Sequence, residues 1–135
     1  MITKKQFLTT RDKLLELARF LVEEVKPGWF NLASWAEPGF PKKKCGTTAC
    51  SVGWATVCFP KCGLKLYSDG NETLGLRYRV DDVVHLGFAA AAQFFGIDWN
   101  DAFWLFDPNS YRYPHNKRKN VAKRLKEIAK KYPGG

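Results

Sequence analysis

The spacing of apolar residues predicts that the chain begins with an amphipathic helix. Apolar side chains recur at helical intervals over residues 7–25, and Pro27 and Gly28 interrupt the pattern. Thr3 and Gln6 have the spacing of a capping box just ahead of it. We therefore expect a helix that starts near Thr3 and ends before Pro27.

Two helical segments are expected in the middle of the chain. Thr47 is a suitable N-cap for a helix that runs to about Val57 and ends before Pro60. Asp81 can cap a further helix over residues 82–95, which is apolar nearly all round and therefore central. We expect this central helix to pack against the first two helices.

Two more helices complete the predicted set. Gly96 ends the central helix, and Asp98 caps a short helix that is rich in aromatic residues. The last helix follows Asn116, and its apolar positions form one stripe: Val121, Ala122, Leu125, Ile128 and Ala129. Lysines and arginines occupy most of its other positions.

A β-hairpin is predicted between the second and the central helix. Residues 64–80 alternate apolar and polar positions on both sides of a turn-rich SDGNET segment. Residues 29–44 show no sustained period and are interpreted as a loop. The pattern predicts one mainly helical (α+β) domain over residues 1–135, with five helices and a small β-hairpin. We expect the PGG end, residues 133–135, to be frayed.

The length of the chain and the distribution of its apolar residues limit the class of protein to which it can belong. A chain of 135 residues buries about two thirds of its unfolded surface, which is enough for one core. No apolar run approaches the roughly 18 residues that a membrane span needs. We therefore expect a cytoplasmic protein that is neither exported nor embedded in a membrane.

The net charge of +9 is unevenly distributed. Lys and Arg number nine against five acids in residues 1–44, four against seven in residues 45–111, and nine against one in residues 112–135. A basic block of this kind attracts an anionic partner such as nucleic acid, a nucleotide or an acidic protein surface. The alternative is a solvated helix face that keeps the protein soluble.

The four cysteines are interpreted as thiols, because the cytosol keeps them reduced. Cys58 and Cys62 frame a turn at Pro60 and are expected to be packing residues. Cys50 and Cys58 would lie about 12 Å apart along a helix, too far to share one zinc ion. The sequence predicts neither a metal site nor a cofactor.

Cys50 is the first candidate nucleophile. It would lie at the positive end of the second helix and close to Lys44, and both features lower a thiol pKa. His85 could act as its base, with Asp81 one helical turn away. Cys45 is the other candidate, and it could also form a reversible disulfide with Cys50. The alternative is that Cys50 is a small buried residue and His85 an ordinary core or surface histidine.

The same segment is a candidate anion site. Backbone amides at the start of a helix bind phosphate when hydroxyls and cations converge there. The residues predicted to contribute are Lys43, Lys44, Thr47 and Thr48, with Trp35 and Trp54 as stacking faces and Arg77 and Arg112 as counter-charges. No known nucleotide-binding fingerprint is present. The alternative is that most of the aromatic residues belong to the core.

Residues 89–106 have the outline of a helix-turn-helix, in which two helices meet at Gly96. The second helix supplies Trp99, Asp101 and Phe103 instead of side chains that read base edges. We therefore interpret the pair as core helices and not as a sequence-specific DNA reader.

The block CGTTACSVGWA follows WFNLASW and precedes AAQFFGIDWNDAFWLF. Over residues 29–128 this arrangement resembles a group of small uncharacterised proteins of bacteriophage and bacterial genomes, with the pattern F[DN][ML]xxW, then CGTxACxxGWA. The resemblance implies no activity. It implies that the positions to test first are Cys45, Gly46, Thr47, Ala49, Cys50, Gly53 and Trp54.

Three functions remain open from the sequence. The first is a cytoplasmic phage-type or bacterial accessory protein, in the host cytoplasm if phage-encoded, that binds an anionic nucleotide-like ligand or an acidic partner. It could counter host defence by sequestering a nucleotide signal. The second is a hydrolase that uses Cys50 or Cys45. The third is non-specific binding of nucleic acid through the C-terminal basic helix.

Overall fold

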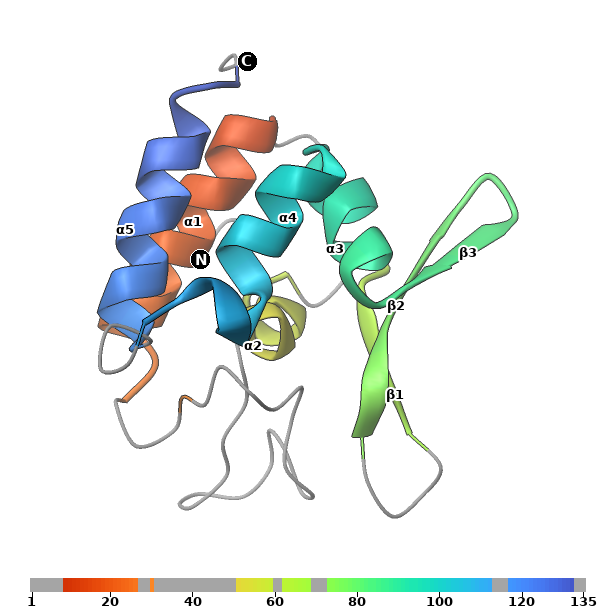
Figure 1. Ribbon diagram of the computed structural model, residues 1–135. Helices are drawn as coiled ribbons and strands as arrows, with labels where there is room; N and C mark the ends of the chain where they lie inside the picture. The colour runs from red at the N-terminus through yellow and green to blue at the C-terminus, as the bar shows by residue number, and fades with distance from the viewer. Residues whose placement is uncertain are drawn as a thin grey trace.

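The computed structural model describes residues 9–26, 30, 51–59, 62–68, 73–112 and 117–132. This part of the chain forms a mainly helical fold with a small antiparallel sheet at one side (Figure 1). Its five α-helices are α1 (Thr10–Glu23), α2 (Ser51–Cys58), α3 (Gly87–Phe95), α4 (Trp99–Phe106) and α5 (Arg118–Ala129). The predicted fold class, mainly α (α+β) with five helices and a small β-hairpin, is confirmed.

Helix α1 begins later than the sequence pattern suggested. Thr9 is its N-cap, because the backbone there is extended and the side-chain oxygen accepts a hydrogen bond of 3.1 Å from the N–H of Asp12. The predicted start at Thr3 was therefore wrong for α1. The predicted capping box with Gln6 lies outside the described residues.

The sheet has three strands, β1 (Lys65–Ser68), β2 (Thr73–Val80) and β3 (Val83–Leu86), in the order β1-β2-β3. Strands β1 and β2 form the predicted hairpin, in which Lys65 lies opposite Arg77. Strand β3 was not predicted. It pairs with β2 in a second hairpin, where Val80 lies opposite Val83.

The second hairpin corrects the prediction of one helix over residues 82–95. Asp81 has φ 49° and Asp82 has φ 67°, so both residues adopt the left-handed conformation that a two-residue hairpin turn requires. Aspartate tolerates this conformation better than most residues. Asp81 is therefore a turn residue and not a helix cap. The following VVHL run forms a strand, and α3 starts only at Gly87.

A glycine at the end of α3 brings this helix close to α1. Gly96 has φ 76°, and the N–H groups of Gly96 and Ile97 donate to the Ala92 carbonyl at 2.9 and 3.0 Å. A Cβ at this position would lie 2.5 Å from Oγ1 of Thr10. Glycine is therefore required here for both backbone conformation and space.

The core lies between the helices and the inner face of the sheet. Phe59, Phe94 and Phe95 form its aromatic centre, with Phe59 ring centroids 5.2 and 6.2 Å from the other two. Helix α3 packs mainly against β2 and α4 and less against α1, and α1 packs mainly against α5. In the part of the chain that the structure describes, no helix has both the length and the apolar character to cross a membrane.

Candidate binding surface

Most residues of the predicted anion site and both candidate nucleophiles fall outside the described part of the chain. These residues are Trp35, Lys43, Lys44, Cys45, Thr47, Thr48 and Cys50. Helix α2 is described from Ser51 onward. A phosphate site at its start and a nucleophilic thiol there therefore stay predictions.

His85 does not have the predicted helical relation to Asp81. It lies half-buried on β3, opposite Tyr78 of β2, whereas Asp81 lies in the turn between these strands. The prediction that the two residues are one helical turn apart was wrong. The proposed acid partner of a catalytic histidine thus loses its geometric basis.

The other predicted ligand residues do not converge. Trp54 is only 8% exposed, and its ring centroid lies 6.3 Å from that of Phe20, so this ring belongs to the core. Arg77 and Arg112 are both exposed. Arg77 lies on β2, whereas Arg112 follows η3 (Pro108–Ser110) and Tyr111, whose ring contacts Arg124 of α5. Helix α4 lies between α5 and β2 (Figure 1). One ligand-sized site therefore does not use both arginines.

The two thiols in the described residues are consistent with packing. Cys58 is fully buried in the core, and Cys62 is partly buried against it. Among the residues that the structure describes, no three His, Cys, Asp or Glu side chains lie together as a metal site would require.

Helix α5 carries the described part of the basic block. Its buried stripe is the one that the sequence predicts. At its first turn the backbone N–H of Lys117 donates to Oδ1 of Asn120 at 3.2 Å. The apolar stripe of α5 faces α1, so the remaining positions of α5 face solvent or the neighbouring helix α4.

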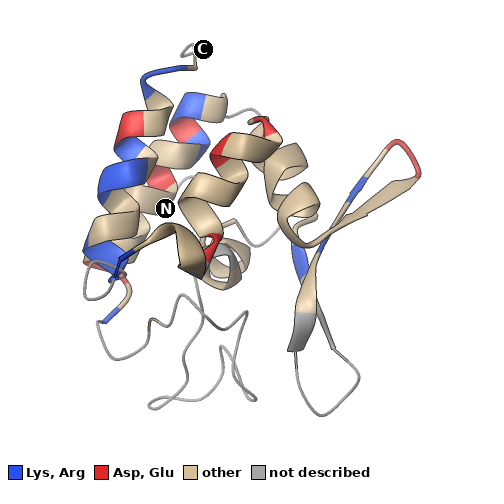
Figure 2. Ribbon diagram, viewed as in Figure 1, with Lys and Arg blue, Asp and Glu red and all other residues tan. Residues whose placement is uncertain are grey.

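Four exposed lysines follow one line along this helix, and we call them the lysine stripe: Lys119, Lys123, Lys126 and Lys130. Spacings of four, three and four residues place them within a narrow sector at 100° per residue, over a length of about 16 Å. No acidic oxygen of the described residues lies within ion-pair distance of them. Figure 2 shows the resulting concentration of basic residues on α5.

The other cations in this region are bound by the protein itself. Nη1 of Arg118 donates to the carbonyls of Leu21 and Val22 at 3.3 and 3.0 Å, near the end of α1. These carbonyls are among those that a helix leaves without intrahelical partners. Arg118 therefore caps α1 and joins it to α5.

Arg124 has the most extensive set of contacts. Its guanidinium carbon lies 3.4 Å from the ring centroid of Trp104 and 3.7 Å from that of Tyr111. Nη1 donates to the carbonyl of Trp104 at 2.9 Å and to Oγ of Ser110 at 3.1 Å, and Nη2 donates to the Ser110 carbonyl at 2.9 Å. We call this arrangement the arginine clamp. It holds α5 against the end of α4 and η3.

Lys131, just beyond α5, binds the first turn of α4. Its Nζ donates to both carboxylate oxygens of Asp101 at 2.8 and 3.0 Å, and Tyr132 Oη donates to Oδ2 at 2.6 Å. Asp101 is buried. Burial, followed by the hydrogen bond to Asp101, raises the pKa of Tyr132 to about 12. Hydrogen bonding to Asp101 also raises the pKa of Lys131.

A small hollow separates the lysine stripe from the arginine clamp. It has a volume of about 290 Å³ and is lined by Tyr111, Asn120, Lys123, Arg124 and Glu127. Tyr111 Oη donates to the carbonyl of Leu105 at 2.7 Å, and burial raises its pKa. Lys123 belongs to the stripe and Arg124 to the clamp, so the two features share one continuous surface.

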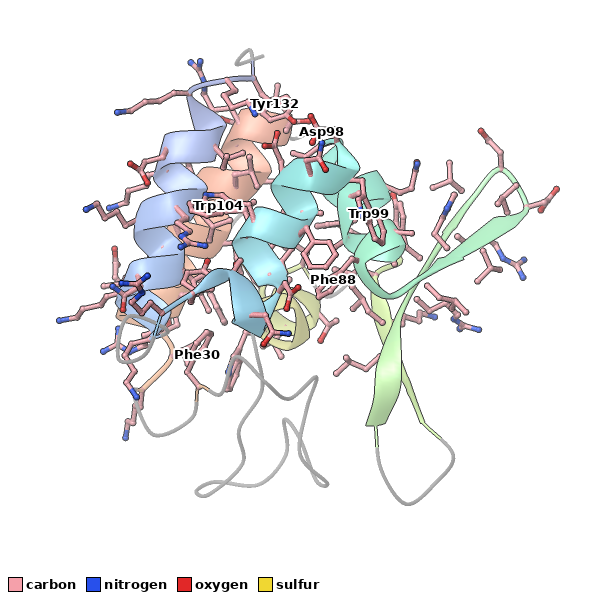
Figure 3. All side chains as sticks on the ribbon, viewed as in Figure 1. Phe30, Phe88, Asp98, Trp99, Trp104 and Tyr132 are labelled. Atoms are coloured by element: carbon pink, nitrogen blue, oxygen red, sulfur yellow. The ribbon has the colours of Figure 1, made fainter. Side chains whose placement is uncertain are left out.

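The outward side of α4 exposes large aromatic side chains, which we call the aromatic row: Trp99 (50% exposed), Phe103 (40%) and Trp104 (46%). The centroids of Trp99 and Phe103 lie 6.0 Å apart, and that of Phe88 lies 5.4 Å from Phe103. Trp99 lies on the α3 side of α4, and Trp104 on the α5 side (Figure 3). The interpretation of this helix as a core helix was therefore wrong for its outward face.

Comparisons of the chain with protein-family models, with curated proteins and with solved structures gave no match. The described residues of α4 and α5 form the candidate surface. That surface combines the lysine stripe, the hollow, the arginine clamp and the aromatic row. Sequence reasoning identified the basic helix but missed the clamp and the aromatic row.

Proposed function

We propose that this protein is a binding protein whose basic helix α5 attaches it to an anionic macromolecule. The observation that carries the proposal is the lysine stripe, which exposes four ammonium groups along one line. Within the described residues, no carboxylate forms an ion pair with any of the four. A polyanion would supply the missing counter-charges.

The arrangement of the stripe favours this function over a merely solvated helix face. Like charges three or four residues apart destabilise a helix by about 0.2–0.5 kcal/mol per pair. The stripe contains three such neighbouring pairs, whereas Arg19 on α1 is surrounded by Glu16, Glu23 and Glu24. The chain thus balances charge on α1 and leaves it unbalanced on α5.

The length of the stripe favours a polymer over a single small ligand. Lysines spread over about 16 Å of helix cannot all contact one phosphate group. The predicted nucleotide-like ligand depends instead on Lys43, Lys44 and Thr47, outside the described residues. It stays a separate prediction.

The biological setting that we propose comes from the resemblance to small phage and bacterial proteins. In that setting the protein is a cytoplasmic accessory factor, and interference with host defence is one role that an anion-binding protein could have there. We do not extend the proposal to a cysteine hydrolase, because His85 lies on a strand and Asp81 in a turn.

The proposal is tested by two triple variants that each remove three positive charges. One is K119Q/K123Q/K126Q in the stripe, and the matched control is K65Q/R77Q/R79Q on the exposed side of the sheet. Fluorescence anisotropy with labelled oligonucleotides and polyglutamate at about 50 mM salt gives the affinities. We expect the stripe variant to lose more than about tenfold in affinity for the polyanion that the wild type binds, and the control to lose less than about threefold. Equal losses in the two variants would show that net charge matters and the stripe does not.

A further inference from the structure

We propose that the polymer bound along α5 is single-stranded nucleic acid, and that one of its bases stacks on Trp104. This inference rests on the proposed function and specifies its partner. It is carried by the position of an exposed, rigidly held indole next to the lysine stripe.

Contacts with Arg124 hold Trp104 in place and leave part of its ring exposed to solvent. The Arg124 guanidinium covers one face of the ring at 3.4 Å, yet 46% of the residue is exposed. The open part is therefore the opposite face and the ring edge. The Trp104 carbonyl accepts hydrogen bonds from Arg124 at 2.9 Å and from Ser110 Oγ at 2.8 Å, which fixes the backbone. A ring ordered in advance loses little conformational entropy when a ligand stacks on it.

The ring and the lysine stripe can contact one ligand. Lys123 belongs to the stripe and Arg124 supports the ring, and both residues line the same hollow of about 290 Å³. Asn120 lines it too and adds an amide that can donate or accept. Tyr111 and the carboxylate-bearing Glu127 complete the lining of the hollow, and Trp104 lies beside it against the Arg124 guanidinium. A strand whose phosphates follow the lysines therefore reaches Trp104 by passing Arg124.

The platform that we propose is Trp104 alone, because Trp99 lies on the α3 side of α4, away from the lysine stripe (Figure 3). Phe103 and Trp99 are 40% and 50% exposed, and their ring centroids lie 6.0 Å apart. Bases of a duplex are stacked on one another and present only their edges, whereas bases of a single strand offer their faces to aromatic side chains. The combination of lysines with open rings thus fits a single strand better than a duplex. An acidic protein surface would use the lysines and leave the rings without a role.

The test uses the full chain and three probes: an oligothymidine of about 20 nucleotides, a duplex of equal length and polyglutamate. Trp104→Ala removes the platform, and Trp104→Phe retains an aromatic face. Trp99→Ala is the matched control, because it removes an equally exposed indole from the α3 side of the same helix. Thermal melting of every variant reports whether it folds.

We expect Trp104→Ala to lower the affinity for oligothymidine by about 5- to 150-fold, the range of one base-stacking contact. Its affinities for duplex and polyglutamate stay within about twofold of wild type, because neither probe stacks on the ring. Trp104→Phe keeps most of the oligothymidine affinity, and Trp99→Ala has a smaller effect than Trp104→Ala.

Three outcomes would overturn the inference. If Trp104→Ala lowers the affinity for all three probes equally, Trp104 acts only by positioning α5. The Trp104→Phe variant distinguishes this result from misfolding. The wild type could bind polyglutamate as tightly as oligothymidine, and Trp104→Ala could leave both affinities unchanged. This result would assign an acidic protein partner, and the proposed function would still hold. If the wild type binds none of the three probes at low salt, both the inference and the proposed function fail.

Discussion

The cations of α5 that border α1 and α4 are held by the protein, whereas those of the lysine stripe are exposed and have no carboxylate partner among the described residues. Arg118 and Arg124 donate to backbone carbonyls, and Lys131 donates to Asp101. The two sets are interspersed in the sequence and lie on different faces of the helix. A basic block that looks uniform in the sequence therefore consists of two sets with different contacts in the structure.

The residue types follow the same division. Both cations of α5 that reach carbonyls are arginines, whose planar fork donates several hydrogen bonds and stacks on aromatic rings. All four residues of the stripe are lysines, which are strongly hydrated point charges on flexible stems. The first type suits a fixed structural contact, and the second suits contact with a mobile polyanion. Predictions of stability should therefore separate the two sets.

The largest expected effect is at the arginine clamp. Arg124→Ala leaves the Ser110 carbonyl and two ring faces without their partner and removes one of the two donors to the Trp104 carbonyl. We expect it to lower the free energy of unfolding by about 3 kcal/mol. Urea denaturation measures the change. The neighbouring Lys123→Ala is the control and should change stability by less than about 0.5 kcal/mol. Similar losses in the two variants would remove the distinction between the clamp and the stripe.

The second-largest loss of stability is expected at the buried carboxylate of Asp101. Asp101→Asn leaves Lys131 without its counter-charge and weakens the bond from Tyr132, and we expect a loss of about 2 kcal/mol. Asp98→Asn is a matched control on the same helix, because asparagine caps a helix about as well as aspartate. An Asp101 variant as stable as the Asp98 variant would contradict the role assigned to this contact.

Replacing Tyr132 is expected to cause a smaller loss of stability, and the size of this loss depends on pH. Its pKa is about 12 in the fold and about 10 in the unfolded chain, so the fold favours the protonated phenol. Its contribution to stability is fully present below about pH 10 and is lost as the pH rises toward 12. Tyr132→Phe should cost about 1 kcal/mol at neutral pH, and the difference from wild type should shrink above pH 10. A difference that stays constant from pH 8 to about 12 would contradict this account.

The smallest stability effect is expected at the lysine stripe. K119Q/K123Q/K126Q removes repulsion between like charges, so its free energy of unfolding should stay within about 0.5 kcal/mol of wild type or rise slightly. The same urea titration checks this. A loss of more than about 1 kcal/mol would mean that these lysines are structural.

The sequence predicted α1 and α5 from their regular apolar stripes, and α2, α3 and α4 from apolar segments bounded by capping residues, glycine or proline. It missed β3 because the VVHL run continues directly into an apolar helix, where periodicity alone cannot separate strand from helix. The left-handed pair Asp81 and Asp82 marks the boundary, yet aspartate before an apolar run also looks like a helix cap. The hairpin turn formed by these two aspartates therefore determines that the VVHL run is a strand.

The candidate surface was predictable only in part. The basic helix follows from composition, and its lysines follow from spacing. The outward aromatic row does not, because α4 also buries Ala102, Leu105 and Phe106, so both of its faces are apolar. The clamp depends on Tyr111 and Trp104 meeting Arg124 across three elements, which no local pattern encodes.

The most direct test of the lysine stripe as a polyanion site is the salt dependence of oligothymidine binding. For single strands the slope of log K against log salt concentration is about −0.7 per phosphate neutralised. Four stripe lysines therefore predict a slope of about −3 for the wild type and about −1 for K119Q/K123Q/K126Q. Equal slopes for the two proteins would contradict the claim that the stripe binds the polymer.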